Sequence, residues 1–162
     1  MLFSNESVAA KNEEMENFLK FTLENESYFI EERQVVKICD MLSISPVLGT
    51  PDYFKGIAKL GDKIIPIIDL PQKLRKKHAA YNNATQIVII DIEGTRCGLI
   101  VDEVETDDNI CANQVHLYIS DMEENQYYFK GFTDFKNDQV KILDCKNLLI
   151  EDNILDLAQL IS

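Results

Sequence analysis

The sequence predicts a mostly β fold built from two related halves, each a small barrel, packed on each other. The chain repeats itself: Phe54-Lys55-Gly56 recurs as Phe129-Lys130-Gly131 (131 − 56 = 75), and Asp69 recurs as Asp144 (144 − 69 = 75). Each half also offers four or five short strands with closely spaced turns, a pattern typical of small antiparallel barrels. At 162 residues the chain has room for two small cores.

The first hairpin of each half is expected where apolar runs flank a short polar turn. Residues 18–30 turn at Glu24-Asn25-Glu26, and residues 87–101 turn at Glu93-Gly94, where glycine supplies the positive φ that a tight hairpin prefers. The two hairpins align at a second offset (87 − 18 = 69). The repeat therefore includes the first hairpin of each half.

The remaining segments follow from turn signals and charge. Gly61-Asp62 is expected to turn the second hairpin, and residues 31–41 to form a helical turn or two with Val35 directed inward. A link at 73–83 would join the halves, and residues 109–125 would form a loop.

The predicted domain boundaries place one two-part domain between a tail and a helix. Residues 1–16 are acidic and weakly periodic, which favours a flexible tail. The domain spans 17–150, with its repeat halves at about 18–78 and 86–150. Apolar residues at helical spacing behind an acidic start predict a short C-terminal helix over 151–162.

Composition excludes several classes of partner. The formal net charge is −12, from 28 acidic and 16 basic residues, so the surface repels nucleic acid and anionic membranes. No apolar run approaches the roughly 20 residues of a membrane helix, and the N-terminus lacks the features of a signal peptide. We expect no nucleic-acid partner, no membrane insertion and a cytoplasmic location.

The sequence predicts no catalytic, metal or cofactor site. The four cysteines are widely spaced and are expected to be free thiols: Cys39, Cys97, Cys111 and Cys145. Phosphate-loop and nucleophile-elbow motifs are absent. Asp69 and Asp144 are expected to end strands and accept hydrogen bonds from backbone N–H groups. The basic run at 73–78 is interpreted as a solvated linker, with binding to an acidic partner as the alternative.

The stretch at residues 54–70, FKGIAKLGDKIIPIIDL, resembles the CheW-like domain of bacterial chemotaxis coupling proteins. Further stretches extend the resemblance over about residues 18–149: the opening strand FLKFTL, the run GLIVDEV at 98–104, and the closing hairpin with YFKG and ILD. The resemblance implies two intertwined, five-stranded SH3-like β-barrel subdomains and no catalysis.

The family resemblance also implies a function and partners. Such proteins are cytoplasmic adaptors that link the regulatory domain of the histidine kinase CheA to the helical tips of chemoreceptors. This chain would therefore be recruited to membrane receptor arrays without entering the membrane. The alternative from another class is a divergent β-barrel that binds a small ligand, or a weak hydrolase that uses His116 with an acidic residue.

The resemblance carries over to particular positions. Val35 and Gly56 match family positions associated with partner coupling, whereas Pro66, Asp69 and Leu70 match framework positions. Where the family has Asn-Leu-Arg-Gly, this chain has Lys59-Leu60-Gly61-Asp62, so the arginine is absent and its position is Gly61. A guanidinium offers a planar fork of donors that glycine does not reproduce. The predicted partner-binding residues are Val35, Gly56, Lys59, Gly61 and Asp62.

Overall fold

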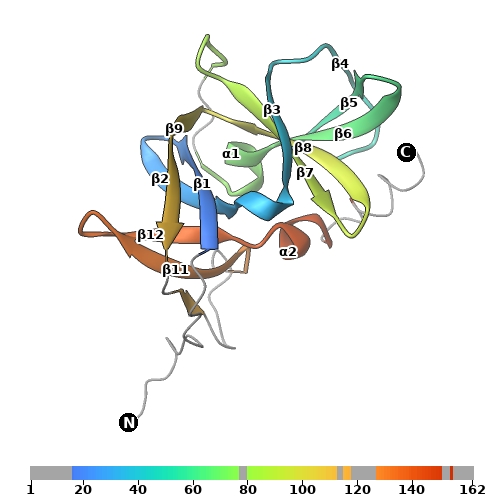
Figure 1. The fold of residues 1–162 in the computed structure, drawn as a ribbon. Coiled ribbons are helices and arrows are strands. Elements are labelled where there is room, and N and C mark those ends of the chain that lie inside the picture. The colour runs from blue at the N-terminus through green and yellow to red at the C-terminus, as the bar shows by residue number, and fades with distance from the viewer. Residues whose placement is uncertain (1–15, 77–79, 113–114, 118–126, 151–153, 155–162) are drawn as a thin grey trace.

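The computed structural model describes residues 16–76, 80–112, 115–117, 127–150 and 154, and within them the fold consists of two six-stranded sheets (Figure 1). The first sheet has the order β10-β11-β12-β2-β1-β9. Its strands are β1 (Glu16–Leu23), β2 (Glu26–Glu31), β9 (Glu103–Ala112), β10 (His116–Leu117), β11 (Phe129–Phe135) and β12 (Asp138–Leu143).

The second sheet has the order β3-β7-β8-β6-β5-β4. Its strands are β3 (Val35–Asp40), β4 (Ile44–Ser45), β5 (Phe54–Leu60), β6 (Lys63–Asp69), β7 (Gln86–Ile92) and β8 (Thr95–Val101). Short helices follow the strands: η2 (Glu32–Gln34), α1 (Leu70–Lys73) and α2 (Cys145–Ile150). The predicted mostly β class is confirmed. Five-stranded closed barrels are not, because each sheet has six strands in the described residues and its strand order is open at both ends.

The two sheets exchange hairpins between the sequence halves. The β1–β2 hairpin joins the β11–β12 hairpin through a parallel pairing in which Tyr28 lies opposite Lys141. The β7–β8 hairpin joins the β5–β6 hairpin in the same way, with Ile67 opposite Gly98. Each half therefore contributes one hairpin to each sheet, and neither half forms a sheet by itself. This is the intertwined arrangement that the family resemblance implied.

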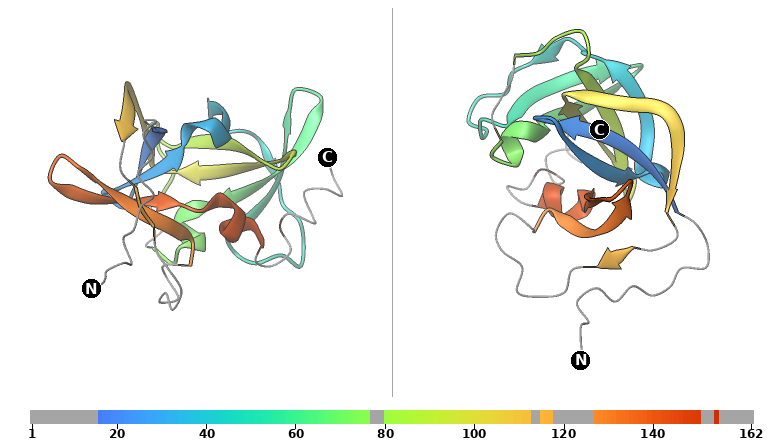
Figure 2. Two further views of the ribbon diagram at one scale, coloured as in Figure 1. Left: turned by 60° about the horizontal axis from the view of Figure 1, so that its bottom comes forward. Right: turned by 90° about the vertical axis from the view of Figure 1, so that its left-hand side faces the viewer.

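All four expected hairpins form, and their two-residue turns differ in backbone. Both central residues have a positive φ in the turns at Glu24-Asn25, Glu93-Gly94 and Lys136-Asn137. In the turn between β5 and β6, Gly61 has φ +64°, and Asp62 is not among the positive-φ residues. The tips of the β5–β6 and β11–β12 hairpins point to opposite ends of the molecule (Figure 2).

Several expected local elements differ in the structure. Residues 31–41 contain only the single turn η2 and then the strand β3, because β3 pairs with β7 along its length. Part of the expected loop at 109–125 is strand, since β9 continues to Ala112 along β1 and β10 pairs with β11. The tail at 1–15 and most of the predicted helix at 151–162 lie outside the described residues, although Ile154 is helical and buried.

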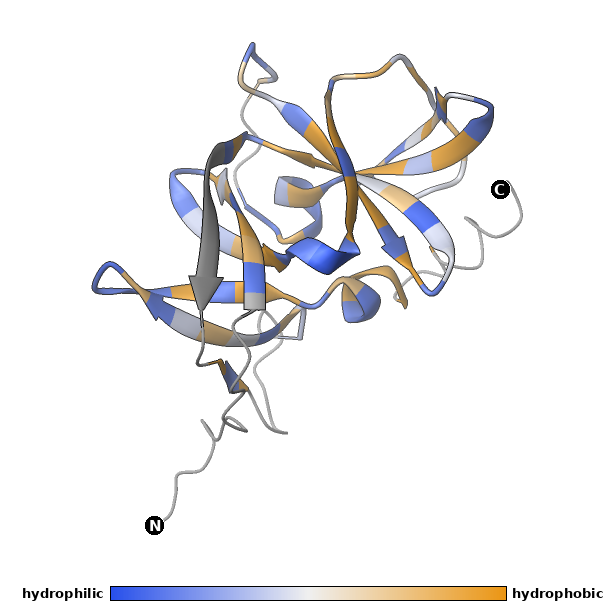
Figure 3. Ribbon diagram, viewed as in Figure 1, coloured by the Kyte–Doolittle hydropathy of each residue, from blue (hydrophilic) through white to orange (hydrophobic). Residues whose placement is uncertain are grey.

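Buried apolar residues join the two sheets into one molecule. The largest cluster combines strands of both sheets with α2 and includes a stack of Phe21 on Tyr28 and of Tyr28 on Phe129, with ring centroids 5.7 and 5.6 Å apart. Figure 3 shows hydrophobic stretches toward the middle of the molecule and hydrophilic hairpin turns. Among the described residues, no helix is both long and apolar enough to cross a membrane.

Candidate partner-binding surface

Gly56 has a structural reason to be glycine. It is buried at an irregular pairing between β5 and β6, with φ +137°, and a Cβ at this position would lie 2.0 Å from the carbonyl oxygen of Ser45 on β4. Gly131 has the matching environment, where a Cβ would lie 2.0 Å from the carbonyl oxygen of His116 on β10. Both glycines therefore let a short edge strand approach closely. Gly56 therefore sets how closely β4 approaches β5.

Val35 begins β3 immediately after η2. It lies opposite Ile90 of β7 and packs, half-buried, against the core cluster shared by the sheets. The next residue, Val36, is 42% exposed. The start of β3 thus presents one anchored and one accessible valine side by side.

Lys59, Gly61 and Asp62 lie at the exposed tip of the β5–β6 hairpin. A Cβ on Gly61 would meet no atom within 4 Å, so an arginine there has space but must adopt a positive φ. A positive φ at the first central residue alone is the pattern of a type II′ turn. The turn therefore has room for a side chain at position 61, but its backbone conformation favours glycine there.

The five predicted residues do not form one cluster in the sheet. Val35 lies on β3 at one edge, and the others lie on or beside β5, next to the opposite edge, with β7, β8 and β6 between them. The predicted residues therefore lie on strands that are not adjacent in the sheet.

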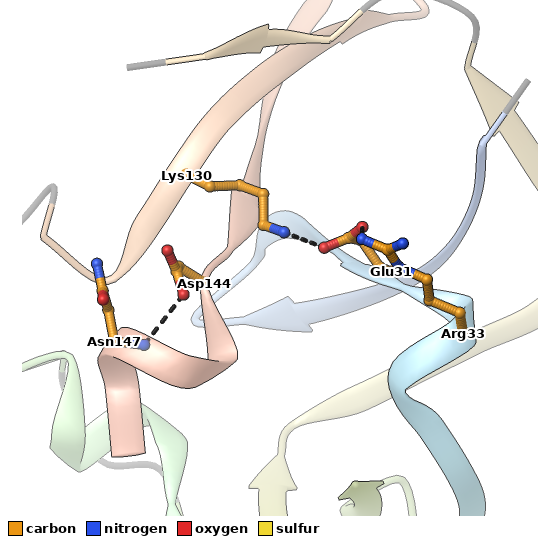
Figure 4. Close-up of polar contacts among 5 residues, drawn as sticks. All are labelled: Glu31, Arg33, Lys130, Asp144 and Asn147. Atoms are coloured by element: carbon orange, nitrogen blue, oxygen red, sulfur yellow. Dashed lines mark hydrogen bonds and ion pairs between the residues drawn. The ribbon is translucent and has the colours of Figure 1, made fainter. Parts of the chain in front are cut away.

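Sequence reasoning missed an ionic cluster centred on the buried Glu31, with Arg33 and Lys130 around it (Figure 4). Glu31 ends β2 with only 3% of its surface exposed, and its Oε1 accepts a hydrogen bond from Lys130 Nζ. Its Oε2 accepts a hydrogen bond from Arg33 Nη2 at 2.6 Å. Lys130 is 99 residues away in sequence. No local pattern predicts this contact, because it depends on the pairing of hairpins from different halves.

Asp69 and Asp144 act as helix caps, as expected from their places at strand ends. The backbone N–H of Gln72 donates to Asp69 Oδ1 at 2.9 Å, and that of Asn147 donates to Asp144 Oδ1 at 3.0 Å (Figure 4). The phenol of Tyr81 also donates to Asp69 Oδ2 at 2.7 Å. Burial, together with the Asp69 carboxylate, raises the pKa of Tyr81.

The described part of the basic run is not a solvated linker. Lys73 is 3% exposed, and its ammonium lies 4.3 Å from the ring centre of Tyr53 and 5.1 Å from that of Tyr128. Lys76 pairs with Glu26 of the other sheet at 3.0 Å. These lysines connect the sheets, which reduces the charge available for an acidic partner. Residues 77–79 lie outside the described part of the chain.

His116, the residue of the alternative hydrolase hypothesis, lies beside an aspartate and an aromatic ring. Its Nε2 lies 3.9 Å from Asp134 Oδ2, longer than a hydrogen bond, and its ring stacks on Phe132 at 4.8 Å. A cavity of about 380 Å³ opens between the β1–β2 and β11–β12 turns, where Lys20 and Lys136 contribute to its lining, but His116 does not.

The cysteines offer little reactivity in the described residues. Cys97 and Cys145 are buried, and burial raises the pKa of both thiols, which keeps them protonated. Cys39 is half-buried, and the side chain of Cys111 lies outside the description. Among the described residues, no group of three or more His, Cys, Asp or Glu side chains could hold a metal ion.

The sequence is similar to those of known chemotaxis proteins. The chain is 32% identical to chemotaxis protein CheW of Klebsiella aerogenes over 100 residues, which is 62% of this chain and 60% of the relative. It is 29% identical to chemotaxis protein CheW of Treponema pallidum over 99 residues, or 59% of this chain and 58% of the relative. These matches span less than two thirds of the length of either relative.

A solved structure shows the same fold. The scaffolding protein TtCheW from Thermoanaerobacter tengcongensis matches with a TM-score of 0.77 and 24% identity, over 86% of this chain and 95% of the other. A family model, the CheW-like domain, matches residues 17–153. The chain therefore belongs to the CheW-like domain family.

Proposed function

We propose that this chain is a non-enzymatic adaptor of chemotaxis-type signal transduction that couples chemoreceptors to the histidine kinase CheA. The observation that carries the proposal is the CheW-like family match over 17–153. The protein would work in the cytoplasm and reach membrane receptor arrays through its partners.

An adaptor must contact two partners at once, and that requires two separate surfaces. The start of β3, with Val35, and the β5–β6 turn, with Lys59, Gly61 and Asp62, lie near opposite edges of the second sheet. Gly56 would support the second surface indirectly, because the lack of a side chain there lets β4 pair closely with β5. One surface would bind the regulatory domain of CheA and the other a receptor tip.

The test is a pair of titrations with the protein in solution. The regulatory domain of the cognate CheA and a helical fragment of the cognate receptor tip are each added to the full chain, and binding is followed by calorimetry. We expect saturable binding of both partners, and simultaneous binding when they are combined. Absence of saturable binding up to high micromolar concentrations of either partner would contradict the coupling function.

A further inference from the structure

Arg33 is an exposed arginine whose guanidinium is held at one end. Its side chain is 74% exposed, while Nη2 lies 2.6 Å from Oε2 of Glu31, whose side chain is 4% exposed. Most surface ion pairs join two mobile side chains and contribute little. Here the acceptor is fixed by burial, so the guanidinium has a preferred direction before any partner arrives.

Lys130 completes this arrangement from another strand. Its ammonium binds Oε1 of Glu31, leaving Oε2 for Arg33, so one buried anion faces two cations. The three charges sum to one positive charge, carried at the surface by Arg33. Glu32, the exposed neighbour of Arg33 on η2, adds a negative charge, so a carboxylate would be attracted by the guanidinium itself rather than by a positive patch.

The turn that carries Arg33 lies next to this cluster. The turn η2 has no buried residue, and its N-cap makes no side-chain hydrogen bond. It contacts β1 of the first sheet and β7 of the second, and it leads directly into β3. The Glu31 contacts therefore lie where the chain crosses from one sheet to the other.

We infer that Arg33 is a carboxylate-binding residue of the partner surface at β3, and that Glu31 and Lys130 are its positioning residues. An arginine has five N–H donors in a planar fork, and the Glu31 contact leaves several of them for a second carboxylate. Val36, 42% exposed, lies three positions along the chain and supplies an apolar contact. The matching partner segment carries an aspartate or glutamate next to an apolar side chain. This inference rests on the proposed coupling function.

The first measurement needs no partner. Side-chain 15N relaxation of the full chain reports how strongly each arginine Nε–H bond is ordered. We expect Arg33 to be more ordered than Arg96, which lies 3.6 Å from a more exposed carboxylate, that of Asp91. Glu31→Gln and Lys130→Met should each lower the order of Arg33 and leave Arg96 unchanged. Equal order of the two arginines in the wild type would overturn the positioning role.

The second measurement separates recognition from folding. With the CheA regulatory domain and the receptor fragment as probes, Arg33→Ala should weaken the binding of one of them by about 30-fold, the scale of an interface hot spot. Arg33→Lys should recover only part of the affinity, because an ammonium lacks the fork. Arg96→Ala is the matched control and should bind like the wild type. Arg33→Ala removes one of the two cations of the buried Glu31 and should lower the melting temperature by about 4–8 °C, so binding is compared at a temperature at which every variant is folded.

The outcomes distinguish the two proposals. Wild-type binding of both probes, unchanged by Arg33→Ala, overturns the role of Arg33 and leaves the coupling function in place. Failure of the wild type to bind either probe rejects the coupling function and, with it, recognition by Arg33. A loss of affinity in Arg33→Ala whose salt dependence matches that of the wild type would also reject a carboxylate contact, since an ion pair weakens as salt increases.

Discussion

The strands that begin with Phe54-Lys55-Gly56 and Phe129-Lys130-Gly131 have one backbone design and two different surroundings. At each glycine a backbone carbonyl oxygen of the neighbouring strand lies so close that an added Cβ would be only 2.0 Å from it. Each second strand ends in an aspartate whose backbone N–H donates to the tyrosine preceding the repeated stretch, at 2.8 Å for Asp69 and 2.7 Å for Asp144. The backbone frame has been kept in both copies.

The lysines in the middle of these stretches have different environments. Lys130 binds the buried Glu31, whereas Lys55 forms no ion pair with any described residue. The position on β8 that matches Glu31 is Ile100, because the first hairpins align at the offset of 69 (100 − 31). Ile100 is buried in an apolar cluster and offers no charge. The repeated sequence therefore fixes the backbone arrangement of both copies. The residue at the matching position of the first hairpins, Glu31 or Ile100, is not repeated, and it decides whether the lysine forms an ion pair.

The largest effects should come from the two glycines. Gly56→Asp and Gly131→Asp should be comparably damaging, each by more than about 3 kcal/mol, because the new side chain meets a backbone carbonyl that has no room to move. Gly49→Asp is the control: Gly49 has φ +80° but open space, so its cost should be about 1 kcal/mol. Thermal melts measure all three. Equal melting temperatures for the wild type and both buried variants would contradict the common backbone design.

The lysine pair should show the next largest difference. Lys130→Met should destabilise the protein by about 2 kcal/mol, because the buried carboxylate of Glu31 loses one of its two cations. Lys55→Met removes the same side chain from the matching position and should change stability by less than about 0.5 kcal/mol. Urea unfolding curves with equal m-values give the change in the free energy of unfolding for both variants. If the two variants unfold at the same midpoint, the buried cluster does not distinguish the copies.

The capping aspartates should differ by a smaller amount. Asp144→Ala removes one N-cap hydrogen bond and should cost about 1 kcal/mol. Asp69→Ala also removes the acceptor of the Tyr81 phenol and should cost about 2 kcal/mol. Tyr81→Phe leaves the cap intact and isolates that second bond. A cost for Asp69→Ala no greater than that for Asp144→Ala would mean that Tyr81 contributes nothing.

The smallest effect is expected at the turn that differs from the other three. Gly61→Arg should cost about 1 kcal/mol, because only the positive φ and not space opposes it. Gly61→Arg with Asp62→Gly restores the family order and should recover the turn. If the arginine contacts a partner, the double variant should also bind more tightly by at most about 1.5–3 kcal/mol. A stable double variant with unchanged affinity would show that binding does not depend on this arginine.

The sequence by itself determined the four hairpins and the resemblance of the two copies. Apolar alternation and short polar turns were sufficient for the four hairpins, because both signals act between residues close in the chain. Asp69 and Asp144 were also readable as strand-ending caps, since the donors they bind lie three residues ahead. The family motifs gave the candidate residues at β3 and β5.

Only the tertiary structure decided which hairpins share a sheet. Alternation fixes which face of a strand is buried but not which strand lies beside it, so the parallel pairs β2–β12 and β6–β8 could not be derived from spacing. The Glu31–Lys130 contact exists because of that pairing, and so does the placement of Lys73 between the repeat-related Tyr53 and Tyr128. Long-range charge contacts leave no periodic signal in the chain, because each needs only one residue at each end.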